Sequence, residues 1–172
     1  MGVDKLIGKT LIDIGSGGGF PAIPVKILKE DLSLTLVEAT GKKCEFLKTV
    51  ATELGLKDVT VINDRAETLS KNSLFREKFD ICTARAVARL NTLAEYCMPF
   101  VKVGGTFVSY KGDAEQEISE AENAVKILGG KIKESYFYEL DGAKRALITI
   151  EKIKNTPQKY PRGNGKERKN PL

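Results

Sequence analysis

Short apolar runs alternate with amphipathic stretches along most of this sequence. The apolar runs predict strands at 11–14, 34–37, 59–62, 80–83 and 106–110. Apolar positions spaced by three and four residues predict helices at 20–28, 47–54, 90–97 and 118–128. Two further strands, 132–140 and 145–153, are joined by Asp141-Gly142 and predict a hairpin.

Strands that alternate with helices form parallel sheets with right-handed crossovers, whereas a terminal hairpin adds an antiparallel pair. The pattern therefore predicts an α/β fold with a doubly wound, Rossmann-like sheet, mostly parallel, with an antiparallel hairpin at its C-terminal edge. A chain of 172 residues suits a single domain of this kind. Ligands of such sheets bind beyond the carboxyl ends of the strands, so the loops that follow the strands are the places to look for chemistry.

The formal net charge of +5 lies in the last part of the chain. Residues 154–172 hold six Lys and Arg against one Glu, and six minus one accounts for the whole excess. Prolines and glycines interrupt this stretch, which predicts an extended segment suited to phosphate contacts, with a solvated, disordered tail as the alternative. We therefore divide the chain into a domain, residues 1–153, and a basic Pro/Gly-rich tail, residues 154–172.

The sequence contains no histidine, and its three cysteines, Cys44, Cys82 and Cys97, are widely spaced. The lack of histidine removes the usual general base and the commonest metal ligand. The cysteine spacing suits neither a disulfide framework nor a zinc site, which predicts reduced side chains. No apolar run approaches the ~20 residues that span a bilayer, and no export signal is seen at the N-terminus. We expect a cytoplasmic monomer that uses neither a metal nor a membrane.

A glycine-rich loop follows the first predicted strand. Its glycines allow the backbone to approach a ligand, and the N–H groups at the start of the next helix stay free to meet it. Two motifs fit the loop: Gly17-x-Gly19-x-x-Ala22 matches a dinucleotide fingerprint, and Asp13-x-Gly15-x-Gly17-x-Gly19 matches the first motif of class I methyltransferases. The second motif begins where the strand ends and is therefore favoured.

Acidic residues follow the next two strands. Glu38 lies 19 positions after Gly19, where a carboxylate can accept hydrogen bonds from both hydroxyls of a ribose. The run Asp64-Arg65-Ala66-Glu67 lies in the loop that would border an adenine ring. An alternative, compatible with the first, is that Asp64 caps a helix N-terminus.

Several motifs carry a family resemblance when they are taken in order along the chain. They are Asp13-x-Gly15-Ser16-Gly17-x-Gly19-Phe20-Pro21, Gly41-Lys42-Lys43, Arg65-Ala66-Glu67, Ala84-Arg85-Ala86-Val87-Ala88, Lys111-Gly112 and Thr156-Pro157-x-Lys159-Tyr160-Pro161-Arg162. Together they resemble the ribosomal RNA small-subunit methyltransferase G family, also called glucose-inhibited division protein B, over essentially the whole chain. The resemblance implies a class I methyltransferase that transfers a methyl group from S-adenosylmethionine to N7 of a guanine in 16S ribosomal RNA.

The resemblance and the general geometry of class I methyltransferases also assign site residues. The expected cofactor contacts are Asp13, Gly15, Gly17, Phe20, Glu38, Ala66, Glu67 and Arg85, and the expected catalytic residues are Arg85 and Lys111. Lys111 would contact RNA or the active site, with an exposed strand-end lysine as an equal alternative. Guanine N7 carries a lone pair and no proton, so the implied reaction needs no general base, which agrees with the missing histidine.

The sequence departs from the family in two ways. Family members carry a helical segment before the first motif, whereas ten residues precede the first predicted strand here, so the chain looks N-terminally shortened. Ala22 also replaces the glycine that usually follows Phe-Pro. A domain that binds the cofactor but is catalytically incomplete is therefore a second hypothesis. A nicotinamide-dependent oxidoreductase is a third, disfavoured by the glycine motif and by the absence of an obvious hydride-transfer acid.

Overall fold

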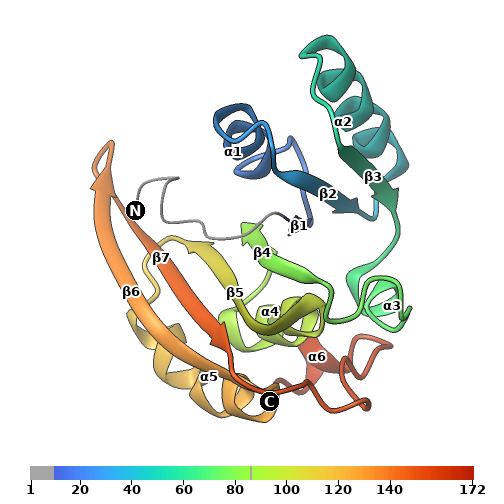
Figure 1. Ribbon diagram of the computed structural model, residues 1–172. Helices are drawn as coiled ribbons and strands as arrows, with labels where there is room; N and C mark the ends of the chain where they lie inside the picture. The colour runs from blue at the N-terminus through green and yellow to red at the C-terminus, as the bar shows by residue number, and fades with distance from the viewer. Residues whose placement is uncertain (1–9, 86) are drawn as a thin grey trace.

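Figure 1 shows a computed structural model of the chain, which describes residues 10–85 and 87–172. Its strands form one sheet in the order β3-β2-β1-β4-β5-β7-β6. The strands are β1 (Thr10–Ile14), β2 (Ser33–Glu38), β3 (Val59–Asn63), β4 (Phe79–Arg85), β5 (Val101–Lys111), β6 (Gly130–Leu140) and β7 (Ala143–Lys152). The first five are parallel, and β7 runs antiparallel to both β5 and β6. The predicted doubly wound sheet with its hairpin is confirmed, and β7 lies inside the sheet while β6 forms its edge.

Helices cover both faces of this sheet. They are α1 (Ala22–Leu28), α2 (Gly41–Glu53), α3 (Ala66–Leu69), α4 (Leu90–Cys97), the 3-10 helix η2 (Met98–Phe100), α5 (Glu115–Ile127) and α6 (Lys166–Lys169). Apolar residues of α1 and α2 enter one core, and those of α4 and α5 enter the other. The three cysteines are free, as predicted, and all three are buried. Among the described residues, no helix combines the length and apolar character of a bilayer span.

The strands at the centre of the sheet alternate between the two cores. In β1, Leu11 enters the core beneath α1 and α2, and Ile12 enters the core beneath α4. Ile81 and Cys82 of β4 divide in the same way, because successive side chains of a strand point to opposite faces. The parallel register pairs Ile14 with both Val37 and Ala84. The carboxyl ends of β1, β2 and β4 are therefore level, which brings their following loops together.

The basic C-terminal segment packs against the body of the domain. Its residues Thr156, Tyr160 and Glu167 are buried. Arg76 donates hydrogen bonds to the carbonyl oxygens of Tyr160 and Thr156, at 3.0 Å each. Figure 1 shows this segment, in red, beneath α3 and beside α4, with α6 as a single helical turn. The division of the chain at residue 153 remains a prediction.

The predicted extended conformation of this segment is wrong for residues 166–169, and a buried carboxylate explains part of the difference. Glu95 of α4 is 0% exposed and accepts hydrogen bonds from the Arg162 backbone N–H and guanidinium, at 2.7 to 3.2 Å. Positive φ angles at Gly163, Asn164 and Gly165 then turn the chain into α6. The positive charge of Arg162, which the sequence analysis assigned to the basic tail, is thus neutralised by Glu95 of α4.

Candidate functional site

Glu38 links the end of β2 to the glycine loop after β1. Its Oε2 atom accepts a hydrogen bond from the Gly17 backbone N–H at 3.0 Å, and its Oε1 atom accepts one from the Thr40 N–H at 3.0 Å. The N–H groups of Gly15 and Ser16 donate to the Val37 carbonyl, which draws the loop toward β2. An ionised carboxylate has about four lone-pair positions, so Glu38 keeps capacity for further donors such as ribose hydroxyls.

The same hydrogen bonds keep Glu38 ionised. Burial by itself raises the pKa of this carboxyl. The backbone hydrogen bonds from Thr40 and Gly17, together with the positive charge of Lys43, outweigh burial and lower the pKa below its ordinary value. Glu38 is therefore a charged acceptor, held in a fixed orientation, at neutral pH.

Gly15 lies where the glycine loop makes a close backbone contact. Its φ angle of +70° is in the left-handed region, and a Cβ atom at this position would lie 2.8 Å from Cγ2 of Val87. The loop after β1 therefore packs directly against the loop after β4. This close contact explains why the predicted motif Asp13-x-Gly15-x-Gly17-x-Gly19 has glycine at position 15.

Asp13 supports this loop from inside the sheet. It is 1% exposed, its Oδ1 atom accepts a 2.6 Å hydrogen bond from the Thr83 hydroxyl, and its carbonyl accepts one from the Ser16 hydroxyl at 3.0 Å. Burial raises the pKa of Asp13 to about 7, against the opposing effect of the Thr83 hydrogen bond. Asp13 does not line the neighbouring cavity, and its expected contact with the cofactor stays a prediction.

A cavity of about 340 Å³ opens beside the glycine loop and the ends of β2 and β3. Four of the predicted residues line it: Gly15, Glu38, Ala66 and Glu67. Ala39 after β2 and Asp64 before α3 complete this part of the wall. Asp64 does not cap α3, because Arg65 occupies the N-cap position and Asp64 accepts the Arg65 backbone N–H at 2.7 Å. The structure thus brings together the two acidic loops that the sequence singled out.

The lining of the cavity also contains residues that the sequence analysis did not predict as site residues. They are Val87 after β4, Tyr96 of α4, and Gly165 and Arg168 of the C-terminal segment. The helical spacing of α4 indicated only an apolar face, and the basic residues of the tail indicated only phosphate contacts. A wall built from two segments this far apart in sequence carries no local signal.

Phe20 and Arg85 lie together, outside the lining of this cavity. The Arg85 guanidinium carbon is 5.7 Å from the centroid of the Phe20 ring, within the range of a cation–π interaction. Phe20 is 55% exposed, which is unusual for a phenylalanine next to a folded core. The structure therefore pairs the two predicted residues with each other, at the end of β4 and the start of α1.

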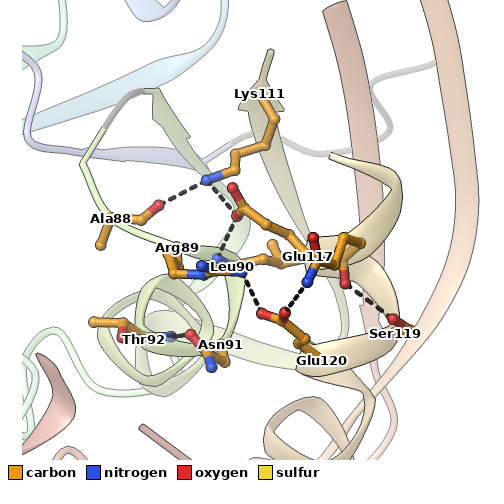
Figure 2. Close-up of polar contacts among 10 residues, drawn as sticks. Ala88, Arg89, Leu90, Asn91, Thr92, Lys111, Glu117, Ser119 and Glu120 are labelled. Atoms are coloured by element: carbon orange, nitrogen blue, oxygen red, sulfur yellow. Dashed lines mark hydrogen bonds and ion pairs between the residues drawn. The ribbon is translucent and has the colours of Figure 1, made fainter. Parts of the chain in front are cut away.

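Lys111 anchors the loop between β4 and α4, as Figure 2 shows. Its ammonium donates to the Ala88 carbonyl at 2.7 Å and forms an ion pair with Glu117 of α5 at 2.7 Å. Glu117 also accepts the Leu90 backbone N–H at 2.8 Å. The Lys111 side chain is 9% exposed, so the alternative of an exposed strand-end lysine is wrong. Its contact with RNA or the reacting groups stays a prediction.

The geometry of the cavity fits a nucleoside. An ionised carboxylate beside β2 matches two ribose hydroxyls, and the apolar surfaces of Val37, Ala39 and Ala66 suit a flat purine ring. The sheet order, the glycine loop and this strand-end carboxylate define the fold and cofactor site of a class I S-adenosylmethionine-dependent methyltransferase.

Comparison with known proteins narrows this class to one family. The family model described as rRNA small subunit methyltransferase G matches residues 3–149. Proteins named "Ribosomal RNA small subunit methyltransferase G" are 48% identical in Lactobacillus acidophilus and 46% identical in Staphylococcus aureus. These alignments cover 96% and 95% of this chain, and 70% and 69% of the two relatives. The chain belongs to the rRNA small subunit methyltransferase G family, so the resemblance is confirmed and the nicotinamide-dependent alternative is wrong.

Solved structures agree on the fold. M. jannaschii TYW2 in complex with S-adenosylmethionine matches with a TM-score of 0.67 and 14% identity, over 88% of this chain and 74% of that chain. An rRNA methylase from Streptococcus thermophilus matches with a TM-score of 0.65 and 16% identity, over 88% and 92% of the two chains. At such low identity the likeness establishes the sheet and its helices.

Proposed function

We propose that this chain transfers the methyl group of S-adenosylmethionine to N7 of a guanine in 16S ribosomal RNA, free or in the small ribosomal subunit. The family and the names of its relatives support the RNA substrate. The observation that carries the cofactor assignment is Glu38, ionised and held by two backbone N–H groups in the wall of the cavity. We further propose that the protein acts in the cytoplasm, as a monomer and without a metal.

For this reaction the protein has mainly to bind the two reactants and align them. S-adenosylmethionine supplies a methyl group on a sulfonium, and guanine N7 offers a lone pair without a proton to remove. Glu38 accepts the ribose hydroxyls, Ala66 borders the adenine, and the loops after β1 and β4 orient the methionine end. Alignment of two reactants in this way can contribute up to ~7 to 11 kcal/mol in well-oriented systems. We assign Arg85, whose guanidinium lies against the Phe20 ring, to contact with the RNA.

The proposed reaction is tested by incubating the chain with labelled S-adenosylmethionine and unmethylated small subunits or 16S RNA. We expect label in 7-methylguanosine after digestion and chromatography. Label in another nucleoside would overturn the N7 assignment. Saturable binding of S-adenosylmethionine without transfer to either substrate would instead support the hypothesis of a catalytically incomplete domain.

Glu38→Gln is expected to weaken S-adenosylmethionine binding by a factor of about 10 to 100, because charged hydrogen bonds are worth about 1.5 to 3 kcal/mol. Isothermal titration calorimetry measures the change. Glu45→Gln is the matched control, since Glu45 lies on the exposed face of α2 and, among the described residues, its carboxylate forms an ion pair with Lys48 alone. Equal affinities of the two variants would show that Glu38 is not the ribose partner.

Glu117→Gln is expected to slow methyl transfer about tenfold while the Kd for S-adenosylmethionine stays within a factor of three. The substitution breaks the ion pair of Lys111, whose side chain is 9% exposed, and loosens the loop that follows Arg85. Small misplacements near reacting groups cost up to ~100-fold in rate. Glu120→Gln is the control, because Glu120 lies on the same helix as Glu117 and pairs with the exposed Arg89 (Figure 2). If Lys111→Met abolishes transfer and Glu117→Gln leaves it intact, Lys111 acts on the substrate itself.

A further inference from the structure

The C-terminal segment contributes to the same cavity as Glu38. Gly165 and Arg168 line it together with Ala66 and Glu67. In Figure 1 the segment passes beneath α3, which begins at Ala66, and beside α4, which carries Tyr96. The segment therefore reaches the part of the cavity that is formed by the loops after β2 and β3.

Buried contacts fix this segment on both sides of residue 165. Before it, Arg162 forms its ion pair with Glu95 at 2.7 Å. After it, Glu167 is 0% exposed, accepts the Gly163 backbone N–H through its carboxylate, and accepts the Thr92 hydroxyl through its carbonyl at 2.9 Å. Because Glu167 cannot move without breaking these contacts, the neighbouring Arg168 is held at the rim of the cavity.

The Arg168 guanidinium has N–H donors at this rim that remain available for a ligand. Its Nη2 atom lies 3.4 Å from the Val87 carbonyl, a long hydrogen bond. It also acts on Tyr96: burial raises the pKa of this tyrosine, and a hydrogen bond from Arg168 opposes the increase. A guanidinium has five N–H donors in one plane, and it stacks well on flat rings. Arg168 thus presents a planar cation toward a cavity that fits a purine.

We propose that Arg168 is a cofactor-binding residue that contacts the adenosine half of S-adenosylmethionine. The assignment rests on the proposed function of the cavity. The adenosine half is favoured because Arg168 shares the cavity with Glu38 and Ala66, the residues assigned to the ribose and the adenine. In this arrangement the C-terminal segment closes the nucleoside site, and its charge serves the cofactor as well as the RNA.

The experiment compares Arg168→Gln with Lys169→Gln, the adjacent and exposed cation, which does not line the cavity. Calorimetry measures the Kd of each protein for S-adenosylmethionine and for 5′-methylthioadenosine, which lacks the amino-acid half. We expect Arg168→Gln to raise both Kd values about tenfold, by equal factors, and Lys169→Gln to leave both unchanged. Arg168→Lys should recover part of the affinity, and thermal unfolding should show that all variants are folded.

Three results would overturn the assignment. Unchanged Kd values in Arg168→Gln, with or without an increase in KM for the RNA, would place Arg168 outside the cofactor site. A loss of affinity for S-adenosylmethionine alone would place it at the amino-acid half. Absence of binding by the unmodified protein would overturn the proposed function itself, and this result is seen before any variant is compared.

Discussion

Replacing Glu95 with glutamine is expected to lower the free energy of unfolding by about 3 kcal/mol, since removing one partner of a buried ion pair costs about 3 to 5 kcal/mol. Glu95 is 0% exposed and holds both the backbone and the guanidinium of Arg162, which is 21% exposed. Partial hydration of Arg162 places the expected loss at the lower end of the range. Urea unfolding followed by circular dichroism measures it.

Glu120→Gln is the comparison for this experiment as well. Its partner Arg89 is 58% exposed, and such surface pairs contribute about 0 to 1 kcal/mol. We also expect limited proteolysis to cleave within residues 154–172 faster in Glu95→Gln, because the C-terminal segment loses its ion pair with α4. A Glu95→Gln variant as stable as Glu120→Gln would mean that the Arg162 contact does not hold the segment.

Asp13→Asn is expected to remove a pH dependence of stability that the unmodified protein shows between about pH 4 and pH 7. The Asp13 carboxyl has a pKa of about 7 in the folded state and 3.8 as the ordinary value. Between these values the folded protein keeps a proton that the unfolded chain releases, so stability falls as pH rises. The full difference is about 4 kcal/mol, at ~1.36 kcal/mol for each unit of pKa.

Unfolding of both proteins in urea at pH 5 and pH 8 tests this expectation. Asparagine keeps the oxygen that accepts the Thr83 hydroxyl but cannot ionise. Relative to the unmodified protein, Asp13→Asn should gain about 2 to 3 kcal/mol between the two pH values, because other titrating groups are common to both. Parallel pH dependence in the two proteins would contradict the raised pKa of Asp13.

The elements that carry a local pattern were predicted from the sequence, and the structure confirms them. An apolar run in the sequence predicts each core strand, and the Asp141-Gly142 turn joins β6 and β7 as expected. The short helix α6 was not predicted, and α3 was predicted only through the alternative that Asp64 caps a helix, because one helical turn is too short to show a periodic pattern. The placement of β7 between β5 and β6 is likewise a matter of pairing between distant segments.

The same distinction applies to the site. The glycine loop and Glu38 are local signals, since backbone conformation and strand-end position are encoded within a few residues. The surroundings of Lys111 carry no local signal, because its partners Ala88 and Glu117 come from a loop and a helix elsewhere in the chain. A lysine after a strand is consistent with either an exposed or a buried position, and only packing distinguishes the two.

The sequence by itself determined the sheet with its helices, the family, the cofactor and the acidic residues at the strand ends. Tertiary structure alone decided that Asp13 is buried behind its loop, that the buried Glu95 pairs with Arg162, and that Arg168 lines the same cavity as Glu38. The physical reason is that apolar periodicity and glycine conformations are properties of neighbouring residues. The burial and pairing of charges depend on segments that meet only when the chain is folded.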